Sequence, residues 1–118
     1  MLFSKQHIWV EEEEGIAKIG ITEYAQEKLT SILFLDLPGI GDEVTVGEAF
    51  GDAESTKTVV DLYSPVSGKV IAVNEEIIDE PDTINDSPYD SWLIKISISD
   101  KPDDLMSEVE YNEYVKAL

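Results

Sequence analysis

Few side chains in this 118-residue sequence are of the types that build an active site or a metal centre. There is no cysteine, and the single histidine, His7, cannot form a cluster of histidine ligands. The 26 acidic residues are so numerous that pairs of carboxylates arise by number alone, which makes them weak evidence for acid–base catalysis. Because the usual nucleophile, base and metal constellations are missing, the sequence predicts neither an enzyme nor a metal site.

One lysine has unusual surroundings, in the stretch "ESTKTVVDLYSPVSG" at residues 54–68. The β-prone segments on either side, with a threonine before and after the lysine, predict a hairpin with Lys57 at its tip. An exposed lysine is usually only a solvated charge. At a projecting tip, with Glu54 and Asp61 nearby to keep the free amine charged, it would also suit acylation, which removes that charge.

The N-terminal third is predicted to place a hairpin before a helix. Residues 7–10 and 16–21 are the two strands, and the acidic run at 11–15 is their turn. The helix begins at the N-cap Thr22. Its apolar stripe consists of Ile21, Ala25, Leu29 and Ile32. Pro38 and Gly39 then break the chain.

The rest of the chain is predicted to be mainly β. Residues 42–74 form short strands separated by turns, and 79–91 form a polar loop. Residues 92–99 alternate between apolar and polar side chains, as in a strand with one buried face. Ser107 and Glu110 form a capping box at the start of a C-terminal helix. The packing stripe of that helix consists of Tyr111, Tyr114, Val115 and Leu118.

These elements predict a mainly β fold, a flattened β-barrel or sandwich hybrid with short helices, including one at the C-terminus. The length suits a single domain over residues 1–118. We expect a cytoplasmic protein, because no apolar run approaches the ~20 residues of a membrane span and the N-terminus lacks a targeting pattern.

The charge is strongly acidic, at −18, with eight lysines and no arginine. Nucleic-acid binding depends on clustered basic residues, so the sequence excludes that class of partner. An acidic surface favours encounters with basic protein surfaces, or it serves solubility alone. With no cysteine in the chain, any redox chemistry must come from a group added to it.

Longer stretches resemble the H proteins of the glycine cleavage system, a family of lipoyl carriers. The matching segments are "HIWV" (7–10), "GITEYAQEKL" (20–29), "LPGIGDEV" (37–44), "FGDAESTKTVVDLYSPVSGKVIAVN" (50–74), "DEPDTINDSPYDSWLIKI" (79–96) and "DDLMSEVEYNEY" (103–114). The most specific signal is Glu-Ser-x-Lys followed by Ser-Pro-x-x-Gly. Biotin carriers of similar fold usually have Met on both sides of the lysine, where this chain has Thr56 and Thr58.

The resemblance implies a flattened barrel of two sheets with lipoate attached to Lys57 by an amide, and Glu54, Ser55 and Asp61 as its recognition context. It implies a monomeric carrier that shuttles an aminomethyl group between two enzymes. The implied partners are a pyridoxal-phosphate glycine decarboxylase, a tetrahydrofolate-dependent aminomethyltransferase, dihydrolipoyl dehydrogenase and the lipoate-attaching enzymes.

One departure from the family leaves alternatives open. Ile8 stands where the family usually has an acidic residue that helps to hold the amine of the loaded arm, and Lys28 adds a positive charge on the early helix. A lipoate or octanoate relay for other enzymes is therefore an alternative to glycine cleavage. A third hypothesis is an unmodified interaction module with the same fold.

Overall fold

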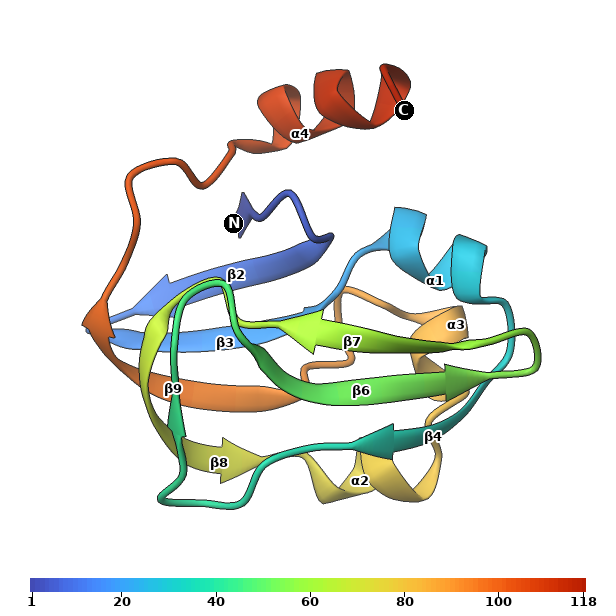
Figure 1. Ribbon diagram of the computed structural model, residues 1–118, viewed down its shortest axis with the longest axis horizontal. Coiled ribbons are helices and arrows are strands. Elements are labelled where there is room, and N and C mark those ends of the chain that lie inside the picture. The colour runs from blue at the N-terminus through green and yellow to red at the C-terminus, as the bar shows by residue number, and fades with distance from the viewer.

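The computed structural model describes residues 1–118 and contains two antiparallel β-sheets with four short helices (Figure 1). The strands are β1 (Leu2–Phe3), β2 (Ile8–Glu13), β3 (Ile16–Ile21), β4 (Ile32–Asp36), β5 (Glu43–Val44), β6 (Ala49–Ser55), β7 (Val59–Tyr63), β8 (Ser67–Val73) and β9 (Ile94–Asp100). The helices are α1 (Glu23–Leu29), α2 (Glu75–Asp79), α3 (Thr83–Asp86) and α4 (Glu108–Lys116).

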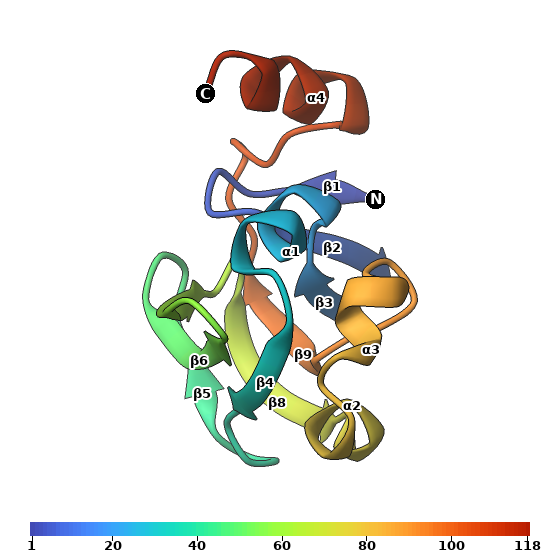
Figure 2. The same cartoon turned by 90° about the vertical axis from the view of Figure 1, so that its right-hand side faces the viewer.

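The larger sheet has the order β1-β2-β3-β9-β8-β5, and the smaller has the order β4-β6-β7. Apolar side chains from both sheets form one core, in which Ile19 and Ile94 come from the larger sheet and Ala53 and Leu62 from the smaller. Helices α4 and α2 lie at opposite ends of the molecule (Figure 2). This two-sheet arrangement confirms the predicted mainly β fold with short helices.

Several local predictions are confirmed. The residues around Lys57 form the hairpin of β6 and β7, whose tip projects at the right-hand edge of Figure 1. In β9, Ile94 and Ile96 are fully buried, as the alternation predicts. The Thr22 side chain caps α1, and the Ser107–Glu110 capping box is formed at the start of α4.

The predicted helix after Thr22 is too long, because α1 ends at Leu29 and Ile32 begins β4. Thr30 adopts a positive φ of 62°, which ends the helix, and the β-prone residues that follow pair with β6. Ile32 is buried as predicted, but it reaches the core from a strand.

Three other local features of the structure also differ from the predictions. Most of the acidic run at 11–15 extends β2, and only Glu14 and Gly15, both with positive φ, make the turn. The predicted polar loop at 79–91 contains α3. Tyr111 of α4 is buried, but Leu118 is exposed because α4 ends at Lys116 and does not include it.

Candidate functional site

Lys57 lies at the tip of the β6–β7 hairpin, and Ser55 organises the backbone of that tip. The Ser55 Oγ accepts hydrogen bonds from the backbone N–H groups of Lys57 and Thr58, both at 3.2 Å. The Ser55 backbone N–H donates to the Thr58 carbonyl at 2.8 Å. Because Ser55 is buried while Lys57 is exposed, the turn is fixed from within and the lysine is directed outward.

The segment after α1 supports the same tip from outside the hairpin. The Thr56 N–H donates to the Ser31 carbonyl at 3.2 Å, and the hydroxyl oxygens of Thr30 and Thr56 lie 3.0 Å apart. Lys57 itself forms no ion pair, since the three salt bridges of the structure involve other lysines. The tip is thus anchored while its amine is free to react.

Two of the residues predicted as recognition context, Glu54 and Asp61, lie on β6 and β7. Neither forms an ion pair with Lys57. The structure therefore shows no ion pair through which either carboxylate would keep the Lys57 amine charged. Their role in recognition stays a prediction.

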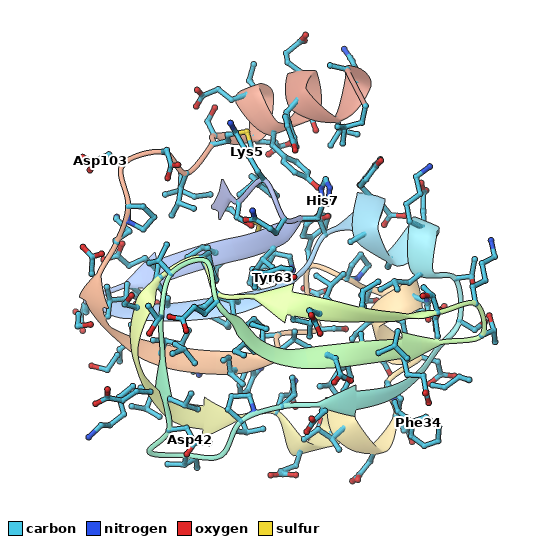
Figure 3. The ribbon with its side chains drawn as sticks, in the orientation of Figure 1. Lys5, His7, Phe34, Asp42, Tyr63 and Asp103 are labelled. Carbon is cyan, nitrogen blue, oxygen red and sulfur yellow. The ribbon has the colours of Figure 1, made fainter.

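A groove of about 370 Å³ runs along β7, from Thr58 beside the lysine to Tyr63 at the other end of the strand. Its other walls come from α1 and from the start of β2. It is lined by Gln6, His7, Ile8, Ile21, Tyr24, Ala25, Lys28, Leu29, Thr58, Val60, Asp61, Leu62 and Tyr63. Figure 3 labels His7 and Tyr63, which contribute to these walls. Because the lining is mostly apolar and starts next to the hairpin tip, an apolar arm on Lys57 fits this groove.

His7 and Tyr111 join the groove to the C-terminal helix. The His7 Nδ1 and the Thr22 Oγ1 each lie 2.8 Å from the Tyr111 Oη. Burial lowers the pKa of His7, so its imidazole is neutral at pH 7. Burial raises the pKa of Tyr111 to about 12, so its phenol is neutral as well. The hydrogen-bonded pair of His7 and Tyr111 therefore carries no charge near neutral pH.

The two residues that depart from the family pattern both line this groove. Ile8 is 1% exposed and contributes an apolar wall. The Lys28 Nζ lies 5.4 Å from the centre of the Tyr24 ring, a cation–π contact at the groove. Asp61 is the one carboxylate in the lining. The groove as a whole was not predicted, because α1 and β7 are about 30 residues apart and no sequence pattern indicates that they meet.

The site has an exposed lysine on a turn fixed by hydrogen bonds, as an attachment point requires. No group of three or more His, Asp or Glu side chains is placed to hold a metal ion. No helix is both long enough and apolar enough to cross a membrane. Two sheets that present one anchored, exposed lysine on a hairpin define a carrier domain of the lipoyl type.

Comparisons with known proteins identify the family within this class. The model of the family described as "Glycine cleavage H-protein" matches residues 1–118. The chain is 48% identical to the glycine cleavage system H protein of Staphylococcus epidermidis over 116 residues, 96% of this chain and 92% of that one. It is also 48% identical to that of Staphylococcus haemolyticus, with the same coverage.

A solved structure agrees with these relatives. The crystal structure of a glycine cleavage system H protein from Mycobacterium marinum superposes with a TM-score of 0.93 at 34% identity, covering 98% of this chain and 95% of that one. The chain belongs to the glycine cleavage H-protein family, as the sequence predicts. Members of this family are not enzymes; they carry a lipoate attached covalently to a lysine.

Proposed function

We propose that this chain is the lipoyl carrier of a glycine cleavage system and that Lys57 is its attachment residue. The observation that carries the assignment is the exposed amine of Lys57 on a turn that Ser55 fixes from within. Forming an amide with lipoate removes the charge of that amine and extends the side chain beyond the hairpin.

When bound, lipoate supplies a disulfide that accepts an aminomethyl group from glycine as carbon dioxide leaves. The residues of the chain position and shelter the arm that bears this group. Ser55, Thr30 and Thr56 hold the backbone at the root of the arm. The apolar wall of β7 and α1 gives the arm a place to lie away from water between partners.

The H proteins of this family act with the other components of the glycine cleavage system. For this chain, the proposed partners are the glycine decarboxylase, the aminomethyltransferase, dihydrolipoyl dehydrogenase and a lipoate-attaching enzyme. We propose that the carrier works as a monomer in the cytoplasm. A tethered group reaches each partner's active site at a high effective concentration, which suits a shuttle between separate enzymes.

The groove favours one second candidate, a relay of lipoyl or octanoyl groups to other enzymes. Ile8 gives the groove an apolar wall and Lys28 brings a positive charge to it. Both residues suit an uncharged acyl arm better than an arm that ends in an ammonium group. Asp61 supplies the only opposing carboxylate.

The attachment residue is tested by replacing Lys57 with arginine. Lys57→Arg is expected to keep the fold and to abolish lipoylation, because a guanidinium group is not an acyl acceptor for the attaching enzyme. Intact mass spectrometry of protein from the native host measures the outcome. Lys69→Arg, at another exposed lysine, is the matched control and keeps its lipoyl group. Lipoate on the Lys57→Arg protein, or on a different lysine, contradicts the assignment.

The two candidate functions are separated by glycine–bicarbonate exchange. The lipoylated native protein is expected to support exchange with the host's glycine decarboxylase, and Lys57→Arg is expected to support none. A lipoylated carrier that gives no exchange, but passes its acyl group to another lipoyl domain, supports the relay instead. A chain that carries no lipoate in its host contradicts both candidates and supports an unmodified interaction module.

A further inference from the structure

A β-bulge places two apolar side chains on the edge of the smaller sheet, close to the Lys57 hairpin. Ile32 pairs with Ser55 and Phe34 pairs with Glu54, so Leu33 is an extra residue in β4. Leu33 is 46% exposed and Phe34 is 65% exposed. Figure 3 shows Phe34 projecting from β4 away from the body of the protein. A bulge changes the direction of neighbouring side chains, and here both Leu33 and Phe34 face solvent.

Phe34 belongs to a row of side chains across the outer face of the smaller sheet. Glu54 lies directly opposite Phe34 on one side and Val59 on the other. Val59 is 54% exposed, so an apolar residue flanks Glu54 on each side. Glu54 precedes Lys57 by three residues, which span at most roughly 10 Å. The row therefore lies within reach of any protein that covers the hairpin tip.

A second row on the same face consists only of aspartates. Asp36 pairs with Asp52, and Asp52 pairs with Asp61. Like charges that lie directly opposite each other on neighbouring strands destabilise a sheet. None of the three forms a salt bridge within the chain. The row therefore presents three negative charges that no cation of the chain pairs with, which suits a partner that brings positive charge.

We propose that these two rows, with Leu33, form the docking face for the enzyme that acylates Lys57. We call this surface the outer face; it consists of Leu33, Phe34, Asp36, Asp52, Glu54, Val59 and Asp61. The partner's complementary surface has an apolar pocket for the Phe34 ring and basic side chains opposite the aspartate row. The proposal rests on the proposed function, because it assumes that Lys57 is acylated.

The position of the face selects this partner over the others. The attaching enzyme must bring an activated acyl carbonyl to the Lys57 Nζ itself, where a nitrogen–carbon bond forms, the activating group leaves and a proton is released. Its surface must therefore cover the hairpin tip and the adjacent strands. Enzymes that act on the far end of a finished arm are separated from the hairpin by the length of that arm. Their contacts are less constrained to lie on β4 and β6.

The apolar part of the outer face is tested with Leu33→Ser and Phe34→Ser in the unmodified protein. The probe is the host's purified ATP-dependent lipoate ligase with lipoate and ATP, and intact mass follows the single acylation. We expect KM for the carrier to rise about tenfold for Phe34→Ser, with kcat little changed. Val109→Ser, at a 73% exposed position on α4, is the matched control and leaves KM unchanged. Equal urea midpoints show that the variants are folded.

The aspartate row of the outer face is tested with Asp36→Asn and Asp52→Asn. Both are expected to lower kcat/KM for acylation and to reduce its dependence on salt. Once lipoylated by prolonged incubation, all variants are expected to be reduced by dihydrolipoyl dehydrogenase at the native rate, with NADH as the electron donor. This second measurement distinguishes the attaching enzyme from the dehydrogenase as the occupant of the face.

Acylation of the native protein distinguishes a failure of the docking face from a failure of the proposed function. If the native chain is not acylated at Lys57, the proposed function fails. If it is acylated and Phe34→Ser has the native KM, the docking face is wrong while the carrier function stands. A Phe34→Ser change that instead abolishes self-association in sedimentation, with KM unaltered, assigns the face to a second copy of the chain and overturns the proposal.

Discussion

Asp61 is the one carboxylate that lines the groove, so we expect the handling of a positively charged arm to depend on it. Ile8 offers only an apolar contact, and Lys28 repels a positive amine. We therefore expect Asp61 of β7, and not Ile8, to pair with the amine of a loaded arm. The strength of such a partly exposed ion pair is limited to about 0–1 kcal/mol.

Removing a carboxylate from the groove, or adding one to it, is expected to change how long an aminomethyl group stays on the arm. Asp61→Asn is expected to speed its loss by up to about fivefold, the rate equivalent of 1 kcal/mol. Ile8→Glu is expected to slow the loss by less, because a carboxylate at a position that is 1% exposed is poorly solvated. Both proteins are loaded enzymatically and freed of partners, and formaldehyde and ammonia release are followed.

The outcome also separates the two candidate functions. If Asp61→Asn and the native protein lose the group at the same rate, the carboxylate does not hold the amine. If the native protein cannot be loaded while Ile8→Glu can, the relay becomes the better assignment.

At the scale of elements, α4 is attached to the body through one aromatic cluster. Tyr111 stacks on Phe3, with ring centroids 4.7 Å apart, and its hydroxyl meets His7 and Thr22. His7 adopts a positive φ of 67° to make this contact. The other titratable side chains packed against the His7 ring are Tyr24 and Tyr114, with ring centroids 4.6 and 6.1 Å away. Burial in this cluster lowers the pKa of His7.

We expect the protein to lose stability in acid partly through His7. Its pKa is lower in the folded state, so below its ordinary pKa of about 6.5 the unfolded chain takes up the proton first. The contribution is fully present above that pH and is lost as the pH falls through the lowered pKa. Urea unfolding at pH 7.5, 6.5 and 5.5 measures it. His7→Asn should show a smaller decline, since asparagine tolerates a positive φ. Equal declines would mean that other groups dominate.

At the scale of the whole molecule, the lysines are unevenly distributed. Of the eight lysines, Lys57 is the only one between residues 29 and 68, the region that contains the entire smaller sheet. Other lysines, such as Lys18, Lys69 and Lys95, lie on strands of the larger sheet. The strands of the smaller sheet thus carry only acidic charges, at Asp36, Asp52, Glu54 and Asp61, and acylation of Lys57 removes the one cation of their hairpin.

Association with partners is expected to depend on salt. Raising the ionic strength from 0.05 to 0.5 M should slow association several-fold, since surface charges are screened beyond ~10 Å at 0.1 M. Stopped-flow measurements with each purified partner give the rate. Reduction of the arm by a small neutral phosphine is the control, and it should be independent of salt. Association that is indifferent to salt would assign the acidic charge to solubility alone.

The sequence by itself determined the features that depend on neighbouring residues. The turn around Lys57, the capping box of α4 and the alternation of β9 follow from short-range patterns, and all three are present in the structure. The acidic character and the family resemblance can also be read from the sequence without the tertiary structure. The end of α1 at Leu29 was mispredicted, because the apolar spacing continues into β4 and only pairing with β6 decides between helix and strand.

Only the tertiary structure decided which distant side chains meet. The groove joins α1 to β7, and the aspartate row joins three strands whose residues are up to 25 positions apart. The exposure of both Leu33 and Phe34 depends on a bulge that shifts the register by one residue. Register is set by the packing of the whole sheet against the core, so no local pattern of residues specifies it.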